Sequence, residues 1–285
     1  MKIYEFSPFF NENLVAGIKI KENSKWADQT IITEANLTHS YKEKKYSFAG
    51  VGQNVIHNKI DAKKIFKKPG WGPSRKFPFF RYKTKKWVNE SINRNSCFCL
   101  DSINDSDIVI MSDIDEITDP KFIPLIVEEV KKRGVVTFKM VYTLMYFNLV
   151  SSNNGAPDWS YRVFFMTGEY FNSMSRTPDQ LRKLGERGQL MSEIYCIPDF
   201  CGFHHSWLGD LEAAIQKFRA YSHEPDDFGG GLVARGDIDR EFIQRCIFDG
   251  RSFLDDGSEL NLYEGPFLSS VVELRKQRGD LFFSV

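Results

Sequence analysis

The chain has 285 residues of ordinary globular composition, 42% hydrophobic and 27% charged, which suits one large α/β domain or two small ones. Because no segment has the composition of a linker, we predict a single domain over residues 1–285. Its 38 basic and 38 acidic residues balance, which argues against a nucleic-acid or membrane binder, because both partners favour a basic excess. With no signal-like N-terminus, no run approaching the ~20 apolar residues of a membrane span and five cysteines without zinc-type spacing, we predict a cytoplasmic protein with no transmembrane segment.

The first third of the chain predicts a βαβ unit followed by a loop and a helix. Residues 2–6 alternate like a strand, 13–25 have helical spacing, and 28–34 contain a β-branched run typical of a buried strand. Residues 57–83 predict an irregular loop, because Gly and Pro cluster within them. Residues 87–98 return to helical spacing. This order of elements is typical of an α/β fold.

Charge is sorted along the middle of the chain. Residues 59–86 carry eleven basic side chains and one acid, whereas 101–119 carry seven acids and no base. Within the acidic segment, the apolar run 108–111 predicts a central strand buried on both faces. A helix capped by Asp119 and ended by Gly134 should follow, and then a strand from 135 to 142.

Asp113 and Asp115 stand directly after the predicted central strand. Ligands of open α/β sheets bind beyond the carboxyl ends of strands, where this pair falls. Two carboxylates spaced Asp-x-Asp can both reach one hard cation, and Mg²⁺ or Mn²⁺ prefers such oxygen ligands. A metal there would neutralise a leaving diphosphate. A solvated loop is the alternative interpretation of the same spacing.

A second polar cluster precedes an amphipathic pattern over residues 208–221. His204 and His205 are adjacent, and one of them is a candidate third metal ligand or diphosphate donor. Lys217 and His223, on or just after the predicted helix, are candidates to face the same anion. For these helix charges, a solvated face is the alternative.

The sequence resembles glycosyltransferase family 17, whose members include the beta-1,4-mannosyl-glycoprotein N-acetylglucosaminyltransferase and bacterial and viral relatives. The similarity lies in five blocks that occur in the family's order: residues 4–12, residues 34–48, Glu90 with residues 93–95, residues 112–117, and residues 202–208 with Lys217 and residues 222–224.

The resemblance implies a GT-A fold, with a central, mostly parallel sheet flanked by helices. It also implies an inverting transfer from a nucleotide-diphosphate sugar, a UDP-sugar such as UDP-N-acetylglucosamine or UDP-xylose, to a glycan or glycoprotein acceptor. The implied cofactor is Mn²⁺ or Mg²⁺, with Asp113, Asp115 and His204 as its predicted ligands. The predicted nucleotide-binding residues are Glu34, Arg94, Asp113, Lys217 and His223.

Inversion in one displacement needs a general base that takes the proton of the acceptor hydroxyl. Asp158 and Glu193 are the candidate catalytic residues, because both lie between the acidic motif and the histidines in the sequence. A surface carboxylate is the alternative interpretation of each.

Two other functions fit part of the pattern. A metal-dependent nucleotide-sugar hydrolase or nucleotidyltransferase also places Asp-x-Asp at strand ends, but it usually holds a second ion with further carboxylates, and Glu116 is the obvious extra one. A non-catalytic carbohydrate-binding protein would instead stack sugar rings on its tryptophans.

Overall fold

The computed structural model describes most of the chain: residues 1–68, 71–73, 81–83, 87–152, 158–186, 189–190, 194–209, 239–254 and 258–284. Its strands are β1 (Ile3–Phe9), β2 (Gln29–Ala35), β3 (Val55–Ile60), β4 (Trp71–Pro73), β5 (Arg81–Lys83), β6 (Ile108–Met111), β7 (Glu116–Thr118), β8 (Val135–Leu144), β9 (Leu149–Ser152), β10 (Asp158–Thr167), β11 (Tyr195–Ser206) and β12 (Glu259–Leu262). Its α-helices are α1 (Asn13–Asn23), α2 (Trp87–Asn95), α3 (Ile123–Arg133), α4 (Gly168–Ser173), α5 (Pro178–Glu186), α8 (Arg240–Phe248) and α9 (Ser269–Arg275). The short 3₁₀ helices are η1 (Ala62–Lys64), η2 (Pro120–Phe122) and η3 (Gly279–Leu281).

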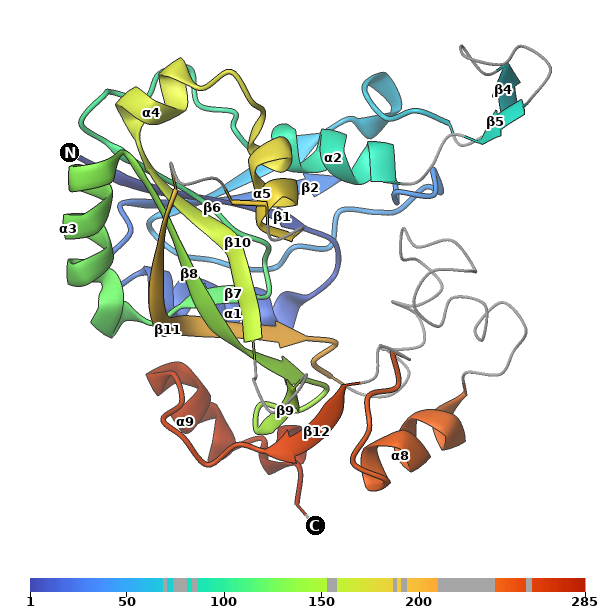
Figure 1. Cartoon of the computed structure of the whole chain (residues 1–285). Helices are drawn as coiled ribbons and strands as arrows, with labels where there is room; N and C mark the ends of the chain where they lie inside the picture. Colours follow the sequence, from blue (N-terminus) through green and yellow to red (C-terminus); the bar gives the residue numbers. More distant parts are fainter. Residues whose placement is uncertain are drawn as a thin grey trace.

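Within these residues, ten strands form one mixed sheet, whose main path runs β12-β9-β8-β10-β6-β1-β2-β3 (Figure 1). Strands β3, β2, β1 and β6 are parallel to one another, in agreement with the mostly parallel sheet that the resemblance implies. The expectation of a mostly parallel sheet is wrong for the other half, where β10 runs antiparallel to both β6 and β8. Strand β11 lies off this path, parallel to β8 and antiparallel to β7.

Several local predictions are confirmed with small shifts at their ends. The first βαβ unit, the central strand and the strand after Gly134 are β1-α1-β2, β6 and β8. The prediction of an irregular stretch from residue 57 is wrong for its start, because β3 continues to Ile60 and pairs with β2. The helix after Asp119 begins with the turn η2, and α3 follows with Pro124 in its first turn. The predicted helix 208–221 lies almost wholly outside the described residues.

Helices cover both faces of the sheet, and alternation along the strands decides which side chains they meet. Ile108 and Ile110 of β6 pack with α3 residues on one face. Val109 and Met111 face the other side, where they pack with Leu181 of α5 and residues that flank α2 and α4. In β1, Ile3 packs in the cluster that contains the α3 residues, and Glu5, which points to the same side, pairs with Lys19 of α1. Helix α1 therefore lies on the same face of the sheet as α3. The carboxyl end of β6 is therefore enclosed from two sides.

The C-terminal segment supports the strands next to the site. Glu22 of α1 accepts a hydrogen bond from the backbone amide of Ser270 at 2.8 Å, which holds the start of α9 against α1. Leu281 and Phe282 then pack in one buried cluster with Ile117 of β7 and other apolar residues from α1 and β11. Apolar residues of α1 and of the C-terminal segment, far apart in the sequence, thus pack together against β7 and β11.

Gly202 lies in the part of β11 that pairs with β7, and the structure leaves no room there for a side chain. A Cβ atom there would come within 2.3 Å of the carbonyl oxygen of Ile117 and 2.7 Å of the Met140 side chain. We therefore expect Gly202→Ala to destabilise the fold by about 1–3 kcal/mol, the usual cost of overpacking. Urea unfolding measures this change.

The matched control is Gly17→Ala in α1, where nothing lies within 4 Å of the added carbon. That substitution should stabilise the protein by about 0.5–1 kcal/mol, because Ala is the better helix former. Equal stabilities of the two variants would contradict the close packing of β11 on β7.

Candidate active site

The acidic motif forms a tight turn between β6 and β7. The amide of Ser112 donates to the carbonyl of Phe6 in β1, so the turn begins on the parallel half of the sheet. The Glu116 amide donates to the Asp113 carbonyl at 3.1 Å, and the Asp113 amide donates to Glu116 Oε2 at 2.7 Å. These bonds close the turn and place Asp115 at its far end, next to β7.

His204 reaches this turn through strand pairing. In the antiparallel ladder of β11 and β7, His204 lies opposite Glu116, and the neighbouring His205 amide donates to the Asp115 carbonyl at 2.8 Å. His204 Nε2 is 3.4 Å from Asp115 Oδ2. The ring also stacks on Tyr142 of β8, with centroids 5.1 Å apart and planes 11° apart. The structure therefore brings Asp115 and His204 together, with the imidazole held flat against an aromatic ring.

His205 has a different environment from its neighbour. Its Nδ1 is 2.7 Å from the Thr143 hydroxyl, and its ring stacks on Phe203 and meets Phe147 edge-on. Burial lowers the pKa of His205 to about 3, with a further contribution from His204. His205 is therefore a neutral core residue, and of the two histidines His204 is the one that faces the acidic turn.

Asp113 lies between two arginines from different helices. Arg94 of α2 donates to both carboxylate oxygens of Asp113, at 3.1 and 2.9 Å, and Arg182 of α5 approaches within 2.8 Å. Arg94 also pairs with Glu90 at 2.9 Å and with Asp179 at 3.2 Å. Burial by itself would raise the pKa of Asp113, but Arg182 and Arg94 outweigh it and hold that pKa well below its usual range.

Glu116 and Arg182 form a buried bidentate pair. The two Arg182 nitrogens donate to the two Glu116 oxygens at 2.9 and 2.8 Å, and both side chains are almost fully buried. Burial would raise the pKa of Glu116, yet the Arg182 guanidinium lowers it below its ordinary value. Arg182 was not among the predicted site residues. The signal for it in the sequence is Glu186 one helical turn later, whose carboxylate lies 3.2 Å from Arg182 Nε.

Glu34, predicted to bind the nucleotide, is buried at the end of β2 among protein partners. Its carboxylate contacts Lys44 at 2.6 Å, His57 at 3.1 Å, and the backbone amides of Ser47 and Phe48 at 2.7 and 3.1 Å. Burial would raise the pKa of Glu34, but Lys44 and the backbone amides of Ser47 and Phe48 lower it. These contacts hold the loop after β2 in place. Glu34 would therefore affect nucleotide binding indirectly, by setting the position of that loop.

The remaining predicted residues have varied positions. Asp158 opens β10, where its backbone lies in register with Val141, and Val141 lies in register with Phe203 next to His204. Glu193, Lys217 and His223 lie outside the described residues. In the part of the chain that the structure describes, no group of three or more His, Cys, Asp and Glu side chains is arranged around a common metal position. Asp113 is instead turned to the arginines, and its metal role stays a prediction.

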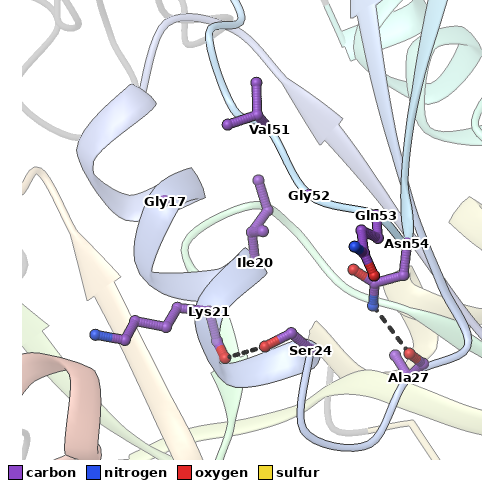
Figure 2. Close-up of a pocket in the computed structure, with 9 residues that line it drawn as sticks. All are labelled: Gly17, Ile20, Lys21, Ser24, Ala27, Val51, Gly52, Gln53 and Asn54. Atoms are coloured by element: carbon purple, nitrogen blue, oxygen red, sulfur yellow. Dashed lines mark hydrogen bonds between the residues drawn. The ribbon is translucent and has the colours of Figure 1, made fainter.

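A shallow pocket of about 550 Å³ lies elsewhere, between α1 and residues 51–54 (Figure 2). Its lining comes from Ile20, Ser24 and Ala27 on one side and Gly52 and Asn54 on the other. These residues precede β2 and β3, so the pocket lies at the amino ends of the parallel strands. Asp113 follows the carboxyl end of β6, the end at which α/β sheets bind ligands, and we therefore place the candidate site there.

Comparison with protein families identifies the chain as a glycosyltransferase, a transferase enzyme that acts on a sugar donor and a glycan acceptor. The match covers residues 1–259, and the chain belongs to glycosyltransferase family 17. This confirms the resemblance carried by the five sequence blocks. In the described residues, no helix is long and apolar enough to cross a membrane.

Other comparisons are distant. The chain matches no curated protein. It shares 11% identity and a TM-score of 0.35 with mannose-6-phosphate isomerase from Helicobacter pylori, over 70% of this chain and 97% of that one. It shares 11% identity and a TM-score of 0.36 with S. aureus TarS 1-349, over 77% and 64%. Likeness at this level carries no argument about function.

Removing the Arg182 charge should destabilise the fold in a pH-dependent manner. Arg182→Met leaves buried Glu116 without its guanidinium, which we expect to cost about 3–5 kcal/mol at neutral pH. In the wild type, the lowered pKa of Glu116 gives stabilisation that is present at neutral pH and is lost as the pH falls below the ordinary value of 4.5. In the variant, protonation relieves the buried charge, so the gap between the two proteins should narrow toward acid pH.

Urea unfolding at neutral pH and near pH 4 measures this gap. Arg278→Met is the control, because Arg278 forms an exposed pair with Asp280 and should change stability little at either pH. A gap for Arg182→Met that stays constant with pH would contradict the assignment of Glu116 as its charged partner.

Proposed function

We propose that the chain is an inverting, metal-dependent glycosyltransferase that transfers a sugar from a UDP-sugar donor to a hydroxyl of a glycan acceptor. The observation that carries the proposal is the pairing of Asp115 with His204 at 3.4 Å, beyond the carboxyl end of a parallel strand. Membership of glycosyltransferase family 17 supports the glycosyl transfer itself.

The side chains of Asp115 and His204 fit a divalent cation. A carboxylate oxygen and an imidazole nitrogen that face each other are both ligands of Mn²⁺, and the donor's phosphates and water complete such a coordination shell. A bound Mn²⁺ or Mg²⁺ would supply neutralisation of the negative charge that develops on the leaving diphosphate. Asp115 and His204 would hold the ion, while Tyr142 keeps the imidazole plane in place.

Asp113 suits a second role in donor binding. Its carboxylate is 22% exposed and stays ionised because Arg94 and Arg182 lower its pKa. An ionised carboxylate at this edge of the sheet accepts hydrogen bonds from hydroxyls, so the donor ribose or a metal-bound water is the partner we expect. The two arginines fix its orientation before the donor arrives.

Inversion requires a base on the acceptor side of the sugar. Asp158 remains our candidate, because its backbone lies two strands away from β11 and in register with the residue before His204. The base would take the acceptor proton as the hydroxyl oxygen attacks the anomeric carbon and the bond to the diphosphate breaks. Glu193 is the second candidate.

A panel of nucleotide sugars, incubated with Mn²⁺ and glycan acceptors, tests the function. We expect one UDP-sugar to give a glycoside product with inverted anomeric configuration, and to raise the melting temperature only when Mn²⁺ is present. Release of free sugar faster than transfer to any acceptor would favour a nucleotide-sugar hydrolase instead.

Asp115→Asn should abolish transfer while leaving the fold intact. The amide keeps the shape of the side chain but removes the negative charge, so the loss should exceed the roughly 10–100-fold cost of losing an outer-shell partner of a metal. Initial rates and circular dichroism measure the two parts. Asp119→Asn is the matched control, because Asp119 caps η2 and Asn caps equally well. Full activity of Asp115→Asn in metal-free buffer would contradict the proposal.

The adjacent histidines provide a second test. His204→Gln should weaken Mn²⁺ binding in the presence of UDP by about 10-fold or more. His205→Gln should instead lower the melting temperature, since His205 is packed in the core, and should keep the Mn²⁺ affinity. Electron paramagnetic resonance of free Mn²⁺ measures the affinity. The same affinity in both variants would show that His204 is not a ligand.

A further inference from the structure

Lys19 of α1 is fully buried beneath the acidic turn. Its ammonium is 2.7 Å from Glu5 Oε1 of β1 and donates to the Ser112 hydroxyl at 2.6 Å. It also donates to two backbone carbonyls of the turn, those of Asp113 at 2.8 Å and Glu116 at 2.7 Å. One buried cation therefore contacts the start and the end of the turn that presents Asp115.

Neutralising Glu5 accounts for only part of this arrangement. A buried carboxylate needs a cation, and the pair with Lys19 satisfies that need. The contacts with the Asp113 and Glu116 carbonyls are not required for it. Those two carbonyls flank Asp115, so bonds to both fix the distance across the turn and hence the direction of the Asp115 side chain.

The same atoms form a connected hydrogen-bond network. The Ser112 hydroxyl donates to Glu5 and lies 3.2 Å from the Ser7 hydroxyl of β1. Lys19, Ser112 and Glu5 thereby join α1, β1 and the first residue of the turn. Glu5 Oε2 has no hydrogen-bond partner within the described residues, so it is the bonds of Lys19 and Ser112 that restrict the backbone segments joined by this network.

We propose that Lys19 is a positioning residue of the active site, which sets the conformation of the turn from Asp113 to Glu116 so that Asp115 meets His204. The inference deepens the function proposed above and rests on it, because it assigns the support of the same metal and donor site. Lys19 acts through the backbone of the turn and does not itself contact the donor.

The competing explanation is that Lys19 only compensates Glu5 and so only stabilises the fold. Three variants separate these roles. The double variant Glu5→Gln/Lys19→Met removes both buried charges, so the fold should keep most of its melting temperature, whereas Lys19→Met alone should lose roughly 10 °C. The double variant and Lys19→Met both remove the ammonium group that binds the two carbonyls of the turn. Glu5→Gln alone does the converse, since it destabilises the fold but keeps Lys19 on both carbonyls.

Lys21→Met is the matched control. Lys21 lies on the same helix, on the opposite face from Lys19, and forms an exposed pair with Glu273. Figure 2 shows Lys21 among the residues that line the shallow pocket, with its amine directed away from the other labelled side chains. The substitution is chemically the same, so any general effect of Lys→Met in α1 appears there as well.

The readouts are Mn²⁺ affinity with UDP, followed by electron paramagnetic resonance, and amide hydrogen exchange of residues 112–118 without metal. We expect the double variant to bind Mn²⁺ at least about 10-fold more weakly than Lys21→Met, and its turn to exchange faster. Glu5→Gln should retain the affinity despite its lower melting temperature.

If affinity and exchange follow melting temperature across all variants, Lys19 is only a partner for Glu5 and the proposal is overturned. If the wild type binds no Mn²⁺ with UDP while the turn of the double variant still exchanges faster, the proposed metal-dependent function fails but the positioning role stands.

Discussion

Three carboxylates lie within four consecutive residues at the turn from β6 to β7, those of Asp113, Asp115 and Glu116. The surrounding structure compensates this concentration of negative charge. Unpaired carboxylates in a buried position would be protonated or would unfold the turn, because burial disfavours the ionised form. Arg182 contacts the carboxylates of Asp113 and Glu116, and Lys19 donates to the backbone carbonyls of the same two residues. The turn therefore exists in this geometry only because several separate elements converge on it.

The layered architecture makes that convergence possible. Because β6 is central and covered by helices on both faces, lysine and arginine side chains reach its carboxyl end from both faces of the sheet. Helix α1 supplies Lys19 from one face, while α2 and α5 supply Arg94 and Arg182 from the other. Strand β11 brings His204 from a third direction, in the plane of the sheet. Each contribution depends on tertiary packing, so the site forms only when the whole sheet has assembled.

This dependence explains which parts could be predicted from the sequence. The strand β6 and the turn after it are local features, and an apolar run followed by acids predicts both. The resemblance to a known family supplied His204, which local pattern alone could not bring to Asp115. Arg182 and Lys19 were missed, because each is a charged residue on a helix and such residues are usually solvated. Their burial follows from contacts across 66 and about 95 residues of chain, which no local pattern encodes. The antiparallel pairing of β10 with β6 and β8 also depends on contacts between distant parts of the chain, so the local sequence could not predict it.

The partners of the three carboxylates also suggest a division of roles. Arginine keeps its proton at neutral and acid pH, so Arg182 remains a cation beside Glu116 and Asp113 as long as those carboxylates are ionised. Asp115 instead faces an imidazole, whose ring nitrogen is a ligand type that metals accept. Under the proposed function, Asp115 and His204 would hold one ion together. Arg182 contacts both Glu116 and Asp113, so the arginine orients the turn while the aspartate beside the imidazole would meet the metal.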